Sequence, residues 1–191
     1  HYMIWEDGNI AQLVGEDKRA WHAGVSSWQG DEDLNSRSIG IEIVNGGHDW
    51  PQADGTLPPF PEAQVATLIE LCQGILKRFE IPATRIVGHS DIAPARKADP
   101  GEHFPWQRLA EAGIGLWPEA EALENQRFTM RALREMLAQI GYAISPSDPD
   151  QETMQACVTA FQRRWTPEGV TGAADAQTQA KIALVHSLFV D

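Results

Sequence analysis

The residues best suited to chemistry lie in one loop that follows a short apolar stretch. His89 comes directly after Ile86–Gly88, and Asp99 comes later in the same loop, which is punctuated by Pro and Gly. Catalytic side chains tend to lie on loops held by rigid elements. A neutral imidazole and a carboxylate both suit zinc, and a catalytic zinc takes three protein ligands and leaves a fourth position for water. The pair predicts part of a zinc site; the alternative is that His89 caps a strand and the charged residues solvate a loop.

Two further charged residues extend this possible reaction centre. Lys97 lies beside Asp99, where its ammonium group could stabilise charge that develops on a substrate oxygen. Glu42 stands between Ile41 and Ile43 in a β-branched run. An inward-facing acid there needs a partner or a task, and beside a metal-bound water it would act as general base. Strict alternation along a strand permits the other interpretation, in which Glu42 faces solvent.

Trp21 and His22 form a third candidate group. The alternative for this pair is a hydrophobic staple with an exposed imidazole. Asn35 is, taken alone, an ordinary polar loop residue. These residue types therefore predict no particular chemistry without further context.

The elements that must position these residues are short strands and one long helix. The β-type runs are Tyr2–Trp5, Ile10–Val14, Ile39–Val44 and Arg85–Val87. An Asp-Gly step between the first two predicts a hairpin, and residues 26–36 are expected to form a polar loop. Apolar residues at helical spacing predict a helix from Pro61 to Phe79. Strand, helix and strand in this order predict an α/β fold, with a mixed central β-sheet and flanking helices.

A second unit is predicted after Gly115–Pro118. Three apolar stripes at helical spacing follow, over residues 133–140, 154–165 and 182–188. Asp175 precedes the last stripe and is a suitable N-cap. We therefore predict two domains, residues 1–118 and a small three-helix domain at 119–191.

Composition excludes some classes of partner. The net charge of −12 argues against a nucleic acid, because binding to phosphates requires a basic face. A hydrophobic content of 42% is ordinary for a globular protein with a core. No apolar run approaches the roughly 20 residues of a membrane span. Cys72 and Cys157 are distant from each other, so we expect two buried free thiols.

Three sequence blocks together resemble a known family. They are Ala20–Gly24, Asn35 with Ser38–Glu42, and Gly88–Ala93 with Arg96–Gly101. In this order, within residues 1–118, they are similar to the zinc-dependent N-acetylmuramoyl-L-alanine amidases of the AmpD/AmiD (Amidase_2) branch. That branch shares its fold with the peptidoglycan recognition proteins, so the resemblance implies the same fold here.

The resemblance implies a role for each residue of the reaction centre. His89 and Asp99 match two of the family's three zinc ligands, with Zn²⁺ as the cofactor. Glu42 matches the acid that activates the water or handles the proton, and Lys97 matches the residue that stabilises the oxyanion. The family's first ligand is a His on an earlier strand, and His1 aligns with a later stretch. We therefore expect that strand, its His and the following helix to lie outside this chain, and we do not take His1 as a ligand.

The resemblance also implies substrate contacts and a setting. Trp21, His22, Asn35 and Arg96 would line the cleft near the sugar and the stem peptide. The implied reaction is hydrolysis of the amide bond between N-acetylmuramic or 1,6-anhydro-N-acetylmuramic acid and L-alanine, in peptidoglycan or its muropeptides. We expect a protein of the bacterial periplasm, a monomer or weak dimer, anchored to the outer membrane only if a lipoprotein signal lies outside this chain.

The C-terminal unit has a resemblance of its own and leaves two other functions open. Its motif, which is similar to the three-helix peptidoglycan-binding domain of cell-wall hydrolases, consists of Phe161–Arg164, Gly169, Gly172, Asp175 and Thr178. The alternative is a helical unit that only packs on the first domain. For the whole chain, one alternative is a non-catalytic module that binds muropeptides without cutting them. The other is a wall-anchoring protein that uses the C-terminal helices alone.

Overall fold

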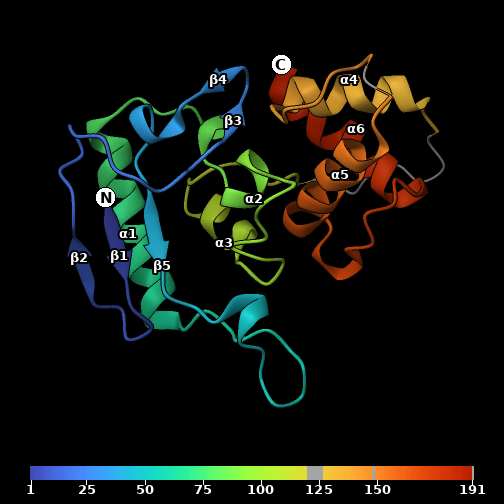
Figure 1. Ribbon diagram of the computed structural model, residues 1–191. Coiled ribbons are helices and arrows are strands. Elements are labelled where there is room, and N and C mark those ends of the chain that lie inside the picture. The colour runs from blue at the N-terminus through green and yellow to red at the C-terminus, as the bar shows by residue number, and fades with distance from the viewer. Residues whose placement is uncertain (120–126, 148, 191) are drawn as a thin grey trace.

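The computed structural model describes residues 1–119, 127–147 and 149–190. A part with strands and a long helix lies at one side and a group of three helices at the other, with α2 and α3 between them (Figure 1). The predicted domain boundary at 118/119 adjoins residues 120–126, which lie outside the described residues, and the division into two domains stays a prediction.

The central sheet is small and mixed, as predicted. Strand β1 (Tyr2–Ile4) pairs antiparallel with β2 (Ile10–Gln12) and parallel with β5 (Ile41–Ile43), so that the strand order is β2-β1-β5. The predicted hairpin is confirmed, and its turn is closed by Gly8, whose N–H donates to the carbonyl of Trp5. The register sets Met3 opposite Glu42 in the middle of β5.

One long helix, α1 (Glu62–Arg78), covers the sheet (Figure 1). Its apolar side is buried against β1, and Pro61 is its N-cap rather than its first helical residue. Gln64 is fully buried on this helix, and its Nε2 donates to the carbonyls of Ile4, 3.1 Å away, and Val44, 2.8 Å away. This side chain therefore fixes the helix to the ends of β1 and β5.

Two predictions of local structure are wrong. Arg85–Val87 is not a strand: η3 (Ala83–Arg85) is a 3₁₀ turn, and Ile86 is extended but pairs with none of the described strands. Residues 26–36 are not simply a loop, because β3 (Ser27–Trp28) and β4 (Asp31–Glu32) form a hairpin followed by η1 (Leu34–Ser36). Its turn residues Gln29 and Gly30 both have positive φ, 50° and 80°, which is typical of the tight turns that match strand twist.

Short helices and turns connect the sheet to the C-terminal part. They are η2 (Gly47–Asp49), α2 (His89–Ile92) and α3 (Trp106–Glu111). The three predicted C-terminal helices are present as α4 (Met130–Ile140), α5 (Gln151–Trp165) and α6 (Ala176–Val190), with η4 (Pro167–Gly169) after α5. The predicted cap is confirmed, because Asp175 Oδ1 accepts from Thr178 N at 2.8 Å. No helix among the described residues has the length and apolarity to cross a membrane.

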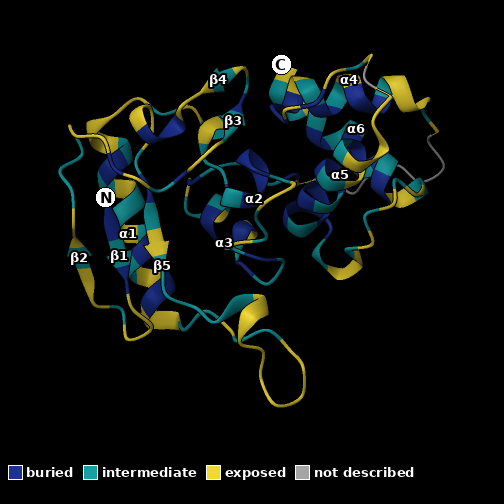
Figure 2. Ribbon diagram, viewed as in Figure 1, coloured by how far each residue is buried: buried dark blue, intermediate teal, exposed yellow. Residues whose placement is uncertain are grey.

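The apolar residues form two clusters. One lies between the sheet, α1 and α3, and includes Ile4, Leu68 and Leu109. The other contains the core of the three C-terminal helices and also takes in side chains from the first part of the chain: Ala23, Trp28, Leu34, Ile92 and Ala93. The buried side of these helices thus continues into the centre of the molecule (Figure 2). The C-terminal helices share their core with the segments that carry residues 20–35 and 89–93.

Candidate active site

One pocket of about 320 Å³ brings together all the residues that the sequence singled out. Its lining residues are Trp21, His22, Gly24, Asn35, Glu42, His89, Arg96, Lys97 and Asp99. They come from the turn after β2, from η1, from β5 and from the α2 segment with its following loop. Segments far apart in sequence therefore converge on a single concave surface.

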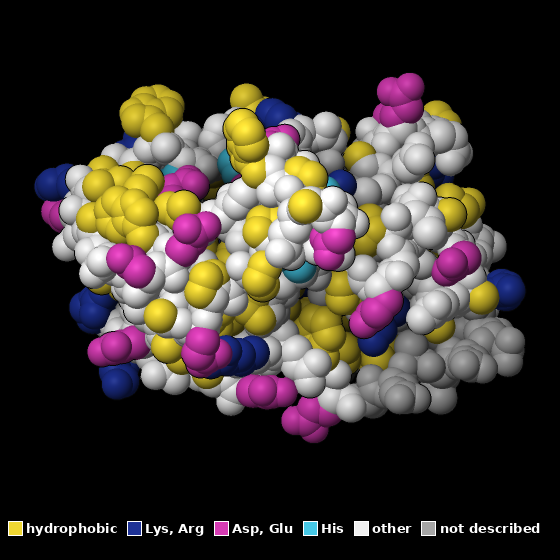
Figure 3. Space-filling view, turned by 90° about the horizontal axis from the view of Figure 1, so that it is seen from below, with side chains coloured by type: hydrophobic (Ala, Val, Ile, Leu, Met, Phe, Trp, Pro, Cys, Tyr) yellow, Lys and Arg dark blue, Asp and Glu magenta, His cyan; other side chains and the backbone are white. Residues whose placement is uncertain are grey.

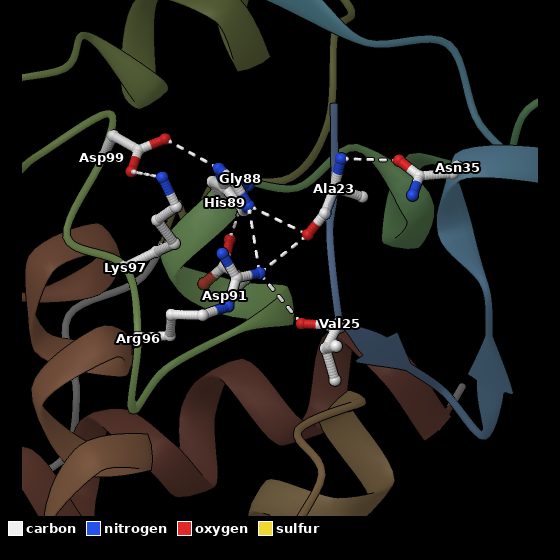
Figure 4. Close-up of polar contacts among 9 residues, drawn as sticks. All are labelled: Ala23, Val25, Asn35, Gly88, His89, Asp91, Arg96, Lys97 and Asp99. Atoms are coloured by element: carbon white, nitrogen blue, oxygen red, sulfur yellow. Dashed lines mark hydrogen bonds and ion pairs between the residues drawn. The ribbon is translucent and has the colours of Figure 1, made fainter. Parts of the chain in front are cut away.

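The centre of the pocket is the pair His89 and Asp99. His89 is the first residue of α2, and its Nδ1 lies 3.0 Å from Asp99 Oδ2. The other ring nitrogen, Nε2, lies 3.1 Å from the carbonyl oxygen of Ala23 (Figure 4). Arg96 Nη2 lies near Nε2 as well, but it donates to the carbonyls of Ala23 and Val25, which accounts for its two hydrogens. Nε2–H of His89 therefore donates to Ala23, and Nδ1 faces the carboxylate, with a proton or a cation between them.

This arrangement fits two ligands of one cation. Two acceptor atoms that face each other need a proton or a positive ion between them. Ligands of a tetrahedral zinc, at about 2.0–2.1 Å from the metal, lie about 3.3 Å from one another. A backbone carbonyl that accepts from the far nitrogen of a ligand His fixes its tautomer in metal sites. The donor types, their spacing and the contact to Ala23 all suit zinc.

The pair supplies only two ligands. Across residues 1–119, 127–147 and 149–190, no group of three or more His, Cys, Asp and Glu side chains is arranged to hold a metal. His1 is not a third ligand, as expected, because its Nε2 lies 2.9 Å from the carbonyl of Lys18 and its Nδ1 accepts from Gly40 N at 3.0 Å. Both ring nitrogens of His1 are therefore occupied within the fold.

Lys97 and Glu42 flank the pair. Lys97 Nζ lies 4.0 Å from Asp99 Oδ1, so an ammonium group stands beside the candidate ligands. Glu42 is exposed between the partly buried Ile41 and Ile43, and it lines the pocket. The two interpretations of Glu42 are thus compatible, since the solvent that it faces is that of the pocket.

Asn35 and Arg96 shape the backbone beside His22. Asn35 is buried, and its Oδ1 accepts from the backbone N–H groups of His22 at 2.9 Å and Ala23 at 2.8 Å. Arg96 Nη2 donates to the carbonyls of Ala23 at 2.8 Å and Val25 at 2.9 Å. These contacts hold the turn whose Ala23 carbonyl orients His89. Direct contact of Asn35 and Arg96 with a substrate stays a prediction.

The neighbouring pair Trp21 and His22 lies at the rim. Trp21 is 82% exposed, which is the opposite of a hydrophobic staple, and the Arg19 guanidinium lies 4.3 Å from its ring centroid. His22 is partly buried, with Nε2 3.4 Å from Ser38 Oγ. Burial lowers the pKa of His22, so this imidazole is neutral at pH 7.

Sequence reasoning missed two groups at the site. The Ala23 carbonyl could not be recognised, because a backbone atom leaves no signal in the sequence. Asp91 was not singled out, although it is buried and accepts from Gly88 N at 2.8 Å. The spacing of Gly88 and Asp91 is that of a helix start with an acid in its third position, and this signal could have found it.

Residues 1–102 match the Amidase_2 family, the N-acetylmuramoyl-L-alanine amidases. Among curated proteins, the chain is 42% identical to the N-acetylmuramoyl-L-alanine amidase AmiD of Escherichia coli over 90% of this chain and 64% of AmiD. It is 46% identical to the 1,6-anhydro-N-acetylmuramyl-L-alanine amidase AmpD of Enterobacter cloacae over 56% of this chain and 52% of AmpD. The chain thus spans about half to two thirds of the length of these relatives.

Solved structures agree with the family match. The complex of E. coli AmiD with anhydro-N-acetylmuramic acid-L-Ala-D-γ-Glu-L-Lys matches with a TM-score of 0.87 and 37% identity, over 99% of this chain and 79% of that one. AmpDh3 of Pseudomonas aeruginosa in complex with anhydromuramic pentapeptide matches with a TM-score of 0.88 and 34% identity, over 99% and 82%. Fold, pocket and sequence lead to one conclusion: the chain belongs to the Amidase_2 family of N-acetylmuramoyl-L-alanine amidases.

Proposed function

We propose that this protein hydrolyses the amide bond between N-acetylmuramic or 1,6-anhydro-N-acetylmuramic acid and L-alanine, with zinc as its cofactor. The observation that carries the proposal is the convergence of His89, Asp99, Glu42 and Lys97 on one pocket, in a chain of this family. Hydrolysis of an amide needs an activated water, a proton acceptor and a cation near the carbonyl oxygen. The pocket contains side chains for each of these tasks.

In the proposed mechanism, His89 and Asp99 would hold the zinc. When bound, zinc polarises the scissile carbonyl and makes water more acidic. Glu42 accepts a proton from the attacking water and passes it to the nitrogen of the leaving L-alanine as the carbon–nitrogen bond breaks. Lys97 donates to the oxygen that becomes negative when the water attacks. The products are a free carboxyl group on the sugar and a peptide with a free amino terminus.

The proposal requires a third zinc ligand besides His89 and Asp99, because catalytic zinc sites have three protein ligands. None is available among the described residues. The zinc content of the purified protein therefore tests the proposal independently of turnover.

For the substrate, we propose muropeptides that carry an anhydro sugar, the class of molecule bound by AmiD and AmpDh3 in the matched complexes. Trp21 is an exposed aromatic face at the rim, next to His22, and such a face suits the apolar side of a sugar ring. Asn35 and Arg96 would position the turn that lies beneath the sugar. The pocket opens to solvent, so a muropeptide from the peptidoglycan of a bacterial envelope could reach it directly.

For residues 119–191 we propose a helical unit similar to peptidoglycan-binding domains. We also propose that the protein is located in the bacterial periplasm.

A nucleic-acid partner is disfavoured by the net charge of −12. On the face seen in Figure 3, Lys and Arg side chains are scattered among acidic ones. Such a surface offers no continuous basic footprint on that face for a phosphate backbone.

The second candidate function is a recognition module that binds muropeptides without cutting them. The presence of only two metal ligands among the described residues favours it. Peptide release from an anhydro-muropeptide, followed by mass spectrometry with and without zinc, separates the two. Zinc-dependent release supports the hydrolase, and tight binding without release supports the recognition module.

A further inference from the structure

We propose that the C-terminal helices position His89 through a buried ion pair between Arg164 and Asp91. This inference rests on the proposed function, in which His89 holds the metal. It assigns the helical unit a task at the reaction centre, in addition to any contact that it makes with the cell wall. Arg164 is in this account a positioning residue that acts through Asp91.

Asp91 connects the helix of His89 to the C-terminal part. Its Oδ2 accepts from Gly88 N at 2.8 Å and from Arg164 Nη1 at 2.9 Å, and its Oδ1 accepts from Tyr142 OH at 2.8 Å. The exposed fractions of Asp91, Arg164 and Tyr142 are 1%, 4% and 3%. One carboxylate, shielded from water, thus joins the residue before His89 to α5 and to the segment after α4. Figure 4 shows Asp91 on the same short helix as His89.

The Arg164 guanidinium is itself held on two sides. It lies 4.1 Å from the ring centroid of Trp106, on α3, and 4.6 Å from that of Trp165, on α5. Cation–π contacts of this kind strengthen when the group is shielded from water. These two rings therefore hold the Arg164 side chain in addition to its contact with Asp91.

Stability alone does not explain this pair. Buried ion pairs can often be replaced by apolar residues without loss of stability, because removing two charges from water offsets much of their attraction. Arg164 Nε is also buried and has no hydrogen-bond partner among the described residues, which makes the pair less favourable. A pair that gains little stability but fixes one geometry fits a positioning role.

The helix held by Asp91 carries the backbone contacts of both candidate ligands. α2 has four residues, of which His89 is the first, and Ser90 N donates to the Asp99 carbonyl at 2.9 Å. Asp91 closes the start of the same turn through Gly88 N. A shift of this turn would change the 3.0 Å spacing between His89 Nδ1 and Asp99 Oδ2. The apolar core supports the same connection, because α2 packs against α5 and Ile92 belongs to the C-terminal cluster.

The test compares variants of α5 and of the segment after α4 that differ in what they contact. Arg164→Met keeps a long side chain between the two Trp rings and removes the charge, and Tyr142→Phe removes one hydrogen bond to Asp91 while the ring stays packed. The control is Gln162→Leu, also fully buried on α5. The hydrogen bonds of Gln162 go to Thr171, Gly172, Ala173 and Thr178, all within the C-terminal part.

The readout is the NMR signal of the His89 imidazole in ¹⁵N-histidine-labelled protein, with unfolding in urea as the measure of stability. We expect Arg164→Met and Tyr142→Phe to shift or broaden the His89 signal, and Arg164→Lys to restore it in part. Gln162→Leu should lower stability and leave that signal in place. An unchanged His89 signal in Arg164→Met and Tyr142→Phe, or an equal change in Gln162→Leu, would overturn the proposal.

This readout separates the inference from the proposed function, because it needs neither zinc nor turnover. In the active protein, the kcat of Arg164→Met should fall by about 10- to 100-fold with KM little changed, as for other partners that orient a metal ligand. If Arg164→Met does not fold, Arg164→Lys decides, because it keeps a positive charge but changes the group that contacts Asp91. A His89 signal identical to that of the parent protein would then overturn the proposal.

Discussion

His89 Nδ1 lies 3.0 Å from Asp99 Oδ2, while the far nitrogen of the same ring contacts the Ala23 carbonyl. The backbone contact sets the tautomer, so two acceptors face each other across a distance that a cation can bridge. The geometry of this pair is the basis of the account. Glu42 and Lys97 line the same pocket.

Glu42→Gln removes the proposed proton acceptor and keeps the shape of the side chain. Turnover should fall by about 10²- to 10⁴-fold, because general base catalysis by a positioned carboxylate contributes that much. Zinc binding should be retained, since Glu42 is not a proposed ligand. Mass spectrometry of released peptide and metal analysis measure the two effects. The matched control is Glu32→Gln, at an exposed acid of β4. Near-normal peptide release by Glu42→Gln would contradict the role assigned to Glu42.

Lys97→Met removes the cation beside Asp99 and keeps most of the side-chain volume. We expect kcat to fall by about 10²- to 10³-fold with a smaller effect on KM, because the oxyanion exists only after attack by water. Steady-state kinetics on an anhydro-muropeptide measure the two constants. Lys77→Met, in the last turn of α1, controls for loss of a surface charge. An effect confined to KM would instead assign Lys97 to ground-state binding.

Gly141→Ala tests the shared core. Gly141 follows α4 with φ of 140°, and a Cβ there would lie 2.6 Å from Cε2 of the buried Trp28 ring. The free energy of unfolding should fall by about 1–3 kcal/mol, since neither the backbone nor the indole can move freely. Urea unfolding measures it. The control is Gly169→Ala, where a Cβ meets no atom of the described part of the chain within 4 Å. Equal stability of the two variants would show that α4 does not pack on the β3–β4 hairpin as described.

Much of the fold could be predicted from local patterns. Helix α1 and the three C-terminal helices follow from apolar spacing, and the β1–β2 hairpin follows from its Asp-Gly step. Residues 85–87 have strand composition, but a strand also needs a neighbour to pair with, and composition does not report on neighbours. The β3–β4 hairpin turns on Gln29-Gly30, which is a weaker signal than Asn-Gly or Asp-Gly.

The residues that line the pocket could be predicted from the sequence, but the contacts that hold them in place could not. His89, Asp99, Glu42 and Lys97 were found from their types and from the order of the family blocks. The partner of Asp91 could not be, because Arg164 lies 73 residues away in sequence and meets it only through tertiary packing. The sequence likewise predicted a separate helical domain. Only the structure shows that the core of these helices also contains side chains from the first part of the chain.

The two cysteines provide a prediction about pH. Both thiols are free, as expected, but only Cys157 is buried and Cys72 is partly buried. Burial raises the pKa of Cys72 to about 11 and that of Cys157 to about 12. Because both pKa values are higher in the folded than in the unfolded protein, the neutral thiols stabilise the folded state. This contribution is complete below about pH 8.5, the pKa of an exposed thiol, and it is lost as the pH rises toward the pKa values of the folded protein. At pH 8 a thiol reagent should modify the native protein far more slowly than the unfolded protein. Equal rates in both states would contradict the described burial.

The most direct test of the central claim is the zinc content of the purified protein after exhaustive dialysis, compared with that of His89→Ala and Asp99→Ala. We expect about one zinc per chain in the parent protein, as a catalytic site requires, and loss of that zinc in both variants. Zinc retained at full occupancy in both variants would contradict the assignment of His89 and Asp99 as ligands, and zinc-free parent protein would favour the recognition module.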